Sequence, residues 1–203
     1  ASDVYKRQFM WPASFWEKYE YFIRHSAGLG KAPTKSDPDI YDHQYSHCDV
    51  LVVGGGISGI ISAKLSAEKG LDTILIDDKS FLGGSTIYQE NECYKINSVN
   101  SNKWLANEIE SLKNYPNLLI KNRTSLAAFH GYNYLLAREN LTDHLSINEK
   151  KGKVRQRLWK IRAKKVIIAS GSIERPLIFS NNDRPGIILS SSIKKYIDYY
   201  GVK

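Results

Sequence analysis

The stretch Asp49-Val-Leu-Val-Val-Gly-Gly-Gly-Ile-Ser-Gly59 decides the fold of this chain. Its apolar run, Val50–Val53, is typical of a strand that is buried on both faces of a parallel sheet. After the glycines, isoleucine and leucine recur at helical spacing as far as Gly70. Thr73–Ile76 then predicts a second buried strand, which ends at Asp77. The pattern is β-α-β within about thirty residues.

Gly54, Gly56 and Gly59 have the G-x-G-x-x-G spacing of a dinucleotide-binding loop. The first allows the tight turn, the second lets a pyrophosphate approach the backbone, and the third permits close packing of helix on strand. The helix that follows offers free N–H groups and a positive dipole end to phosphates, and Ser58 adds a hydroxyl. The alternative is a strand–helix turn with no ligand, but the second strand and its terminal Asp77 favour a binding site.

Asp77 stands eighteen residues after Gly59, where a carboxylate can accept hydrogen bonds from the hydroxyls of an adenosine ribose. The same charge repels a 2′-phosphate, so NADP is disfavoured against NAD or FAD. Asp78 and Lys79 either flank the ribose and adenine or are plain exposed charges. Gly83, Gly84 and Ser85 predict a loop that returns to the pyrophosphate, with a generic surface turn as the alternative. On these motifs alone, the predicted dinucleotide is FAD.

The expected fold class is α/β, a doubly wound FAD/NAD(P)-binding (Rossmann-like) parallel sheet with an inserted β-meander, incomplete at the C-terminus. Further parallel strands are expected at Leu118–Lys121 and Lys165–Ala169. The meander strands are expected at Ser125–Phe129, Tyr134–Arg138 and Arg155–Arg162.

Three segments are expected along the chain. Asp3–Gln8 match the translation of a sequencing-library adapter, so residues 1–8 are interpreted as a scar, with an ordinary disordered N-terminus as the alternative. Residues 9–47 form an N-terminal arm, with a helix that begins at a capping box at Ser14–Glu17 and a polar linker over 31–47. Residues 48–203 form a truncated dinucleotide-binding domain, in which 170–203 are a crossover containing Glu174, Arg175 and a final helix at Ser192–Tyr200.

The formal net charge is +8, from 29 Lys and Arg against 21 Asp and Glu, and the basic residues are scattered along the chain. It predicts a solvated basic face or a patch for an acidic partner subunit rather than nucleic-acid binding. No apolar run is long enough to cross a membrane and no signal peptide is evident, so a cytoplasmic protein is expected. Cys93, His130 and His144 have no partner at ligand spacing. We therefore expect no catalytic and no metal-binding residue in this chain.

Several longer stretches are far more particular than the glycine loop. They are Met10-Trp-Pro12, His47–Gly56, Tyr134-Leu-Leu136, Arg155-Gln-Arg-Leu-Trp-Lys160, Glu174-Arg-Pro-Leu177 and Asn181-Asn-Asp-Arg-Pro-Gly186. Together, and in this order, they resemble the alpha subunit of heterotetrameric sarcosine oxidase.

The resemblance implies that this subunit holds NAD, while the beta subunit carries FAD and FMN and a C-terminal part absent here binds tetrahydrofolate. The complex, with beta, gamma and delta subunits as partners, oxidises sarcosine to glycine, passing the one-carbon unit to tetrahydrofolate and electrons to oxygen. The NAD contacts it implies fall on Ser58, Asp77, Asp78, Lys79, Ser85 and Leu126, the last beside the adenine. Ser58 stands where the family commonly has Ala, and Ser170 where it has Thr.

Two other functions remain open. The chain could be the FAD-binding subunit of an amino-acid or opine dehydrogenase, or a scaffold for assembly without catalysis. In each case we expect the chain to be inactive alone.

Overall fold

The computed structural model describes residues 12–30, 34–88 and 94–202. Residues 1–8 of the expected scar, and Cys93, lie outside the described residues. Along the sequence the chain divides into two compact units between Pro38 and Asp39.

In the first unit, a 3₁₀ turn, η1 (Ala13–Phe15), leads into α2 (Trp16–Ser26). The expected capping box at Ser14 is not formed, because the N-cap of α2 is Phe15 and no side chain accepts a hydrogen bond there. An ion pair one turn apart, Arg24 with Glu20, supports the helix from its exposed side.

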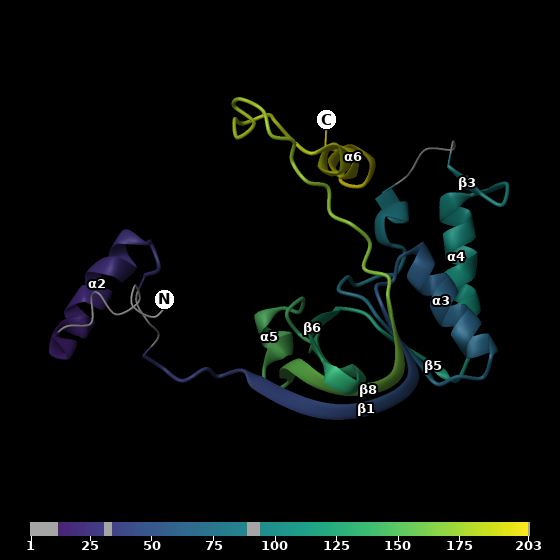
Figure 1. Ribbon diagram of the computed structural model, residues 1–203, viewed down its shortest axis with the longest axis horizontal. Coiled ribbons are helices and arrows are strands. Elements are labelled where there is room, and N and C mark those ends of the chain that lie inside the picture. Colours follow the sequence, from purple (N-terminus) through teal and green to yellow (C-terminus); the bar gives the residue numbers. More distant parts are fainter. Residues whose placement is uncertain (1–11, 31–33, 89–93, 203) are drawn as a thin grey trace. The chain divides into compact units, whose positions relative to one another are not determined.

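The second unit is built on one mixed sheet of six strands in the order β5-β2-β1-β8-β7-β6 (Figure 1). Their bounds are β1 (Ile40–Val53), β2 (Thr73–Ile76), β5 (Leu118–Lys121), β6 (Thr124–His130), β7 (Tyr134–Asn140) and β8 (Val154–Ile168). The first four in this order pair in parallel, and β8, β7 and β6 pair antiparallel. The predicted α/β fold is confirmed, with Val50–Val53 paired between β2 and β8 in the sheet interior.

Two expectations about the strands were wrong. Residues 40–47, expected in the linker, form the first half of β1 and pair with residues 154–162 of β8. The strands expected at 155–162 and 165–169 are one strand, β8, so the meander continues the parallel sheet instead of forming a separate layer. Tyrosine and histidine alternate with polar residues in this half of β1. This alternation does not by itself indicate a strand, and the segment is a strand because β8 pairs with it.

The long strand β1 changes its buried face near Asp49. The N–H groups of Asp49 and Val50 both donate to the carbonyl of Asp72, at 2.8 and 3.1 Å. Cys48 and Leu51 consequently lie in the same core cluster although they are three residues apart. The even-numbered side of the first half of β1 therefore continues into the side that carries Leu51 and Val53.

Two hydrophobic cores cover the two faces of the sheet. On one face, α3 (Ile57–Glu68) and α4 (Ser101–Leu112) pack through Ile60, Ala63, Leu105 and Leu112 onto Val50, Val52 and Leu75. On the other face, the curved half of the same sheet supplies Leu135, Ala137, Trp159 and Ile161 against Leu51, Val53 and Ile76. Asn100 caps α4 by accepting from the N–H groups of Asn102 and Lys103.

The remaining elements are short. They are η2 (Gly84–Tyr88), the pair β3 (Lys95–Ile96) and β4 (Val99–Asn100), η3 (Gly131–Asn133), α5 (Ile147–Lys150) and α6 (Ser190–Asp198). A capping box that the sequence analysis missed, Ser146 with Glu149, starts α5.

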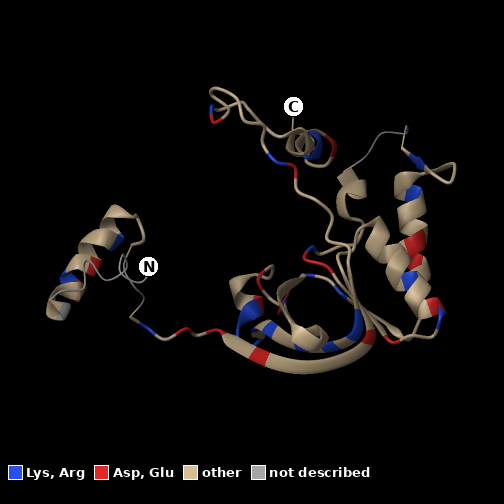
Figure 2. Ribbon diagram, viewed as in Figure 1, with Lys and Arg blue, Asp and Glu red and all other residues tan. Residues whose placement is uncertain are grey.

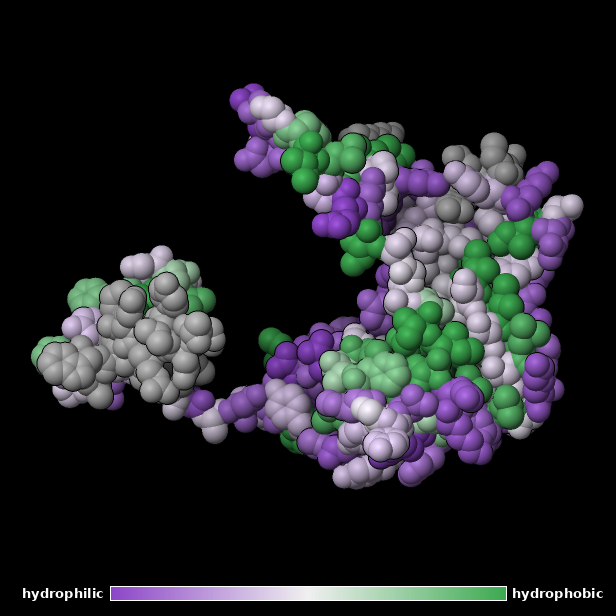
Figure 3. All heavy atoms as spheres, viewed as in Figure 1, coloured by the Kyte–Doolittle hydropathy of each residue, from purple (hydrophilic) through white to green (hydrophobic). Residues whose placement is uncertain are grey.

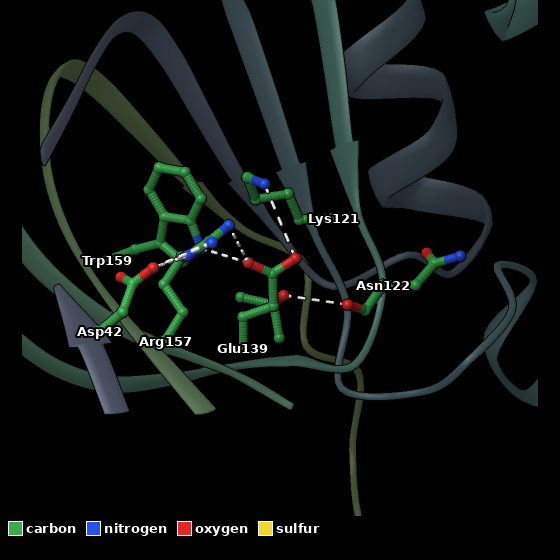
Figure 4. Close-up of polar contacts among 7 residues, drawn as sticks. Asp42, Lys121, Asn122, Glu139, Arg157 and Trp159 are labelled. Carbon is green, nitrogen blue, oxygen red and sulfur yellow. Dashed lines mark hydrogen bonds and ion pairs between the residues drawn. The ribbon is translucent and has the colours of Figure 1, made fainter. Parts of the chain in front are cut away.

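An inner polar cluster, formed by Asp42, Lys121, Glu139, Arg157 and Trp159, lies beside the second core (Figure 4). The guanidinium of Arg157 lies 2.9 Å from the Asp42 carboxylate, and the indole N–H of Trp159 donates to Glu139 at 2.6 Å. The Lys121 ammonium lies 3.7 Å from Glu139 and 4.1 Å from the centroid of the Trp159 ring. These contacts tie together β1, β5, β7 and β8 on the inner side of the curved sheet.

The surface of the described residues carries charges on several elements and apolar side chains on the crossover. Lys and Arg are spread over β8, α4 and α6 (Figure 2). Ile173, Leu177 and Ile178 are between 79% and 98% exposed, and apolar residues are conspicuous along this segment (Figure 3). None of the helices in the described part of the chain combines the length and the apolar character that a membrane crossing requires.

Candidate functional site

A cleft of about 1130 Å³ opens at the carboxyl ends of β1, β2 and β8. This is the edge of an open α/β sheet at which ligands bind, because the loops after parallel strands diverge there. Of the predicted site residues, the cleft is lined by Gly54, Gly56, Ser58, Asp77, Asp78, Lys79, Gly83, Gly84, Ser85 and Leu126. The one predicted residue that does not line it is Gly59, which lies underneath the loop.

The three glycines of the loop play three different structural parts. Gly54 has φ +107°, and a Cβ there would overlap the carbonyl of Ala169 at the end of β8. A Cβ at Gly59 would overlap the carbonyl oxygen of Gly54, so this glycine allows α3 to lie close to the strand. Gly56 has an ordinary φ of −73°, and a Cβ there would meet no atom within 4 Å. The space over Gly56 therefore belongs to the cleft.

The helix α3 begins at Gly56 without a side chain that accepts a hydrogen bond from its first turn. The first N–H groups of a helix have no partner within the helix, and its dipole favours negative charge at this end. Ser58 lines the cleft from the same turn. This corner of the cleft is suited to a phosphate or diphosphate.

Asp77 is 8% exposed and holds the glycine loop in place. Its Oδ2 accepts from the N–H of Gly55 at 2.5 Å, and its Oδ1 accepts from the N–H of Lys79 at 2.8 Å. Since a carboxylate has about four acceptor positions, both oxygens can still accept a further bond from a hydroxyl in the cleft. Asp78 is exposed at the rim, and the Lys79 ammonium lies 5.9 Å from the centroid of the Tyr88 ring.

The loop that contains Gly83 and Gly84 returns to the glycine loop. The N–H of Gly83 donates to the carbonyl of Gly55 at 2.7 Å. Gly84 has φ +57°, and a Cβ there would lie 3.0 Å from the Cα of Gly56. The two loops thus meet at the start of α3, where Ser85 also lines the cleft.

Sequence reasoning missed several residues of the cleft. Gly55 is one, since a Cβ there would lie 2.5 Å from Leu82 Cδ2 and 2.9 Å from Asp77 Oδ2; the run of three glycines was the available signal. Further examples that line the cleft are Thr124, Ser125, Ser172, Ser191 and Lys195, which come from β6, the crossover and α6. No local pattern marks them, because they reach the cleft only through the tertiary fold.

Catalytic and metal chemistry finds no support in the described residues. They contain no group of three or more His, Cys, Asp or Glu side chains that could hold a metal ion. Burial, with Asp49 and Asp72 nearby, raises the pKa of the Cys48 thiol to about 11, so this cysteine is a core residue and a poor nucleophile. The expectation of no catalytic and no metal-binding residue stays a prediction.

The glycine-loop region matches the model of a known family, described as FAD dependent oxidoreductase, over residues 49–101. In overall fold, the chain is similar to the crystal structure of L-proline dehydrogenase from P. horikoshii. The TM-score is 0.61 at 24% identity, and the match covers 85% of this chain and 32% of that one. The predicted dinucleotide-binding fold is therefore confirmed.

Curated relatives match along most of the chain. The alpha subunit of sarcosine oxidase from Rhizobium meliloti (strain 1021) is 37% identical over 202 residues, which are 99% of this chain and 20% of the relative. The alpha subunit from Corynebacterium sp. (strain U-96) is 36% identical over 87% of this chain and 18% of the relative. The chain thus spans about a fifth of the length of these relatives. The resemblance inferred from the sequence is confirmed, and the family match over residues 49–101 supports a flavin or dinucleotide cofactor.

Proposed function

We propose that this chain is the dinucleotide-binding part of a sarcosine oxidase alpha subunit, and that the dinucleotide is NAD. The observation that carries the proposal is the cleft at the carboxyl ends of β1, β2 and β8, with open space over Gly56 at an uncapped helix start. The similarity to sarcosine oxidase alpha subunits over nearly all of the chain supports the choice of protein.

The residues present fit a dinucleotide. Gly56, Ser58 and the first turn of α3 would hold the diphosphate, with Gly84 and Ser85 on its other side. Asp77 would accept from the ribose hydroxyls, with Asp78 and Lys79 at the rim and Leu126 beside the adenine. When bound, NAD supplies a nicotinamide ring that can accept a hydride.

Two carboxylates at the tip of β2 support NAD over NADP. Asp77 and Asp78 line the cleft, and a 2′-phosphate placed there would meet their charge. FAD is the second candidate, because it shares the adenosine diphosphate and because the family match over residues 49–101 is to FAD dependent oxidoreductases.

The wider activity rests on the resemblance. In this proposal the alpha subunit assembles with beta, gamma and delta subunits in the cytoplasm, and the complex oxidises sarcosine to glycine. The one-carbon unit of sarcosine passes to tetrahydrofolate. The electrons of the oxidation pass to oxygen by way of FAD and FMN in the beta subunit. This chain binds NAD as a largely structural group and contributes no catalytic residue. A scaffold without a nucleotide remains the non-enzymatic alternative.

The test is to purify the full chain, release its bound nucleotide by denaturation and identify it by mass spectrometry. NAD supports the proposal, FAD favours the second candidate, and no nucleotide favours the scaffold. Titration of variants with NAD then distinguishes an effect on the binding site from an effect on the fold. Gly56→Ala is expected to fold and to lose most of its NAD binding, since its new methyl group enters the cleft. Gly131→Ala is the matched control, because a Cβ there also meets no atom within 4 Å but lies in η3, away from the cleft lining.

A further inference from the structure

Helix α6 supplies two residues to the cleft, Ser191 and Lys195. They are four residues apart and therefore lie on one face of the helix. This helix lies within the crossover, more than a hundred residues after the glycine loop, and no dinucleotide motif in the sequence includes it. A smaller hollow of about 510 Å³ runs along α6 itself and also borders Lys195.

Aromatic and polar contacts fix the two ends of α6, and one of them is made to Tyr88, which lines the cleft. The Tyr199 ring packs edge-on against Tyr88, with centroids 5.1 Å apart, and lies 6.2 Å from the centroid of Phe81. At the other end, the carboxylate of Glu174 accepts from the N–H groups of Ser190 and Ser191 and from the Ser190 hydroxyl. Because Glu174 occupies the start of α6, the helix faces the cleft with side chains rather than with free N–H groups.

Lys195 is held at the cleft by the same loop that meets the glycines. Its ammonium lies 4.8 Å from the centroid of the Tyr88 ring, at the end of η2, whose first residue Gly84 lies against Gly56. Within the described residues, Lys195 forms no ion pair with a carboxylate. An ammonium group without a carboxylate partner is thus available at the rim of a cleft suited to an anion.

The charges of the cleft lining balance only if Lys195 is counted. Its ionised side chains are the carboxylates of Asp77 and Asp78 and the ammonium groups of Lys79 and Lys195. A dinucleotide brings a diphosphate with two further negative charges. Without Lys195, the lining would be net negative toward an anionic ligand, which is unfavourable at short range.

We propose that α6 forms a wall of the dinucleotide cleft and that Lys195 binds the diphosphate of the ligand. The inference rests on the proposed function only in requiring a dinucleotide, and it holds equally for NAD and FAD, which share that group. It assigns a binding role to a helix outside the β-α-β unit.

The adjacent Lys194 provides a matched control. Its ammonium lies 3.5 Å from the Tyr94 hydroxyl and 4.5 Å from the centroid of that ring, and it does not line the cleft. Lys195→Gln and Lys194→Gln remove the same charge from the same helix, one residue apart. A general effect of net charge would therefore weaken binding equally in both variants.

The experiment titrates the full chain and both variants with NAD, ADP and adenosine by calorimetry. Lys195→Gln is expected to weaken the binding of NAD and of ADP by about tenfold, or about 1.4 kcal/mol, and to reduce the salt dependence of that binding. Adenosine, which lacks phosphate, should bind all three proteins alike, and Lys194→Gln should match the unmodified chain.

Two results would overturn the inference while leaving the proposed function intact. One is an equal loss of NAD affinity in both variants. The other is a loss of adenosine affinity in Lys195→Gln that equals its loss of ADP affinity. Failure of the unmodified chain to bind both NAD and ADP would overturn the proposed function together with the inference. Circular dichroism and urea unfolding of each variant confirm that a loss of affinity is not a loss of fold.

Discussion

The carboxylate of Asp77 accepts a 2.5 Å hydrogen bond from the backbone N–H of Gly55. The tip of β2 is thereby joined to the turn that follows β1, and the second oxygen of the same carboxylate binds the N–H of Lys79. An acidic residue expected to recognise a ribose thus also fixes the loop that faces the phosphates. Stability and ligand recognition are coupled at this one side chain.

Asp77→Asn is expected to destabilise the chain by about 1–3 kcal/mol, because the amide must turn its NH₂ group toward one of two backbone N–H donors. Urea unfolding of the variant measures the loss. Asp78→Asn is the control, since Asp78 is exposed and its neutralisation should change the free energy of unfolding by less than about 0.5 kcal/mol. Equal stabilities of the two variants would contradict the role given to Asp77.

Gly59→Ala is expected to unfold the chain or to destabilise it severely. The new methyl group would overlap the carbonyl oxygen of Gly54, and neither the helix nor the strand can move away without opening the core. Gly70→Ala tests the alternative that glycine is needed only for conformation: Gly70 has φ +75°, but a Cβ there meets no atom within 4 Å. Gly70→Ala should lower the free energy of unfolding by about 1 kcal/mol. Thermal unfolding followed by circular dichroism compares the two.

Glu139→Gln tests the inner polar cluster. Glu139 is 13% exposed on its side chain and faces Lys121, Arg157 and the Trp159 indole. Its neutralisation leaves the poorly solvated Lys121 without a carboxylate, whereas Arg157 keeps its ion pair with Asp42. We expect a loss of about 2–4 kcal/mol in the free energy of unfolding. Glu110→Gln removes an exposed pair with Lys113 on α4 and should cost less than about 0.5 kcal/mol. Similar costs for both variants would show that the cluster contributes little.

Glu174 makes the attachment of α6 dependent on pH. Hydrogen bonds from Ser191, and then from Ser190, lower the pKa of Glu174 from 4.5 to about 2 in the folded chain. A carboxylate whose pKa is lower in the folded state stabilises that state above its ordinary pKa, and the stabilisation is lost as the pH falls. The attachment should therefore be complete at neutral pH and weaken between about pH 4.5 and pH 2.

Hydrogen exchange of the α6 amides across this pH window, corrected for intrinsic exchange rates, is the measurement. In Glu174→Gln the protection of α6 should be lower at neutral pH and should no longer change through the window. If that variant retained the same pH dependence as the unmodified chain, another carboxylate would be responsible.

The site could be predicted where its parts are close in sequence. The strand Val50–Val53, the glycines and Asp77 lie within about thirty residues, and each has a conformation or a charge that few other residues can supply. Gly54 illustrates this, since φ +107° and the overlap with Ala169 admit no side chain. The loop at Gly83 and Gly84 could likewise be predicted, because its two glycines come soon after Asp77 in the sequence.

Only the tertiary structure decided the parts that depend on distant partners. Residues 40–47 form a strand because β8, more than a hundred residues later, accepts and donates their hydrogen bonds, whereas their alternation of aromatic and polar side chains is ambiguous alone. Lys195 reaches the cleft because Tyr199 packs on Tyr88 and Glu174 fixes the start of α6. Local sequence determines backbone conformation over one or two turns or strands, but a lysine side chain faces a ligand, a carboxylate or water according to what the rest of the fold places beside it.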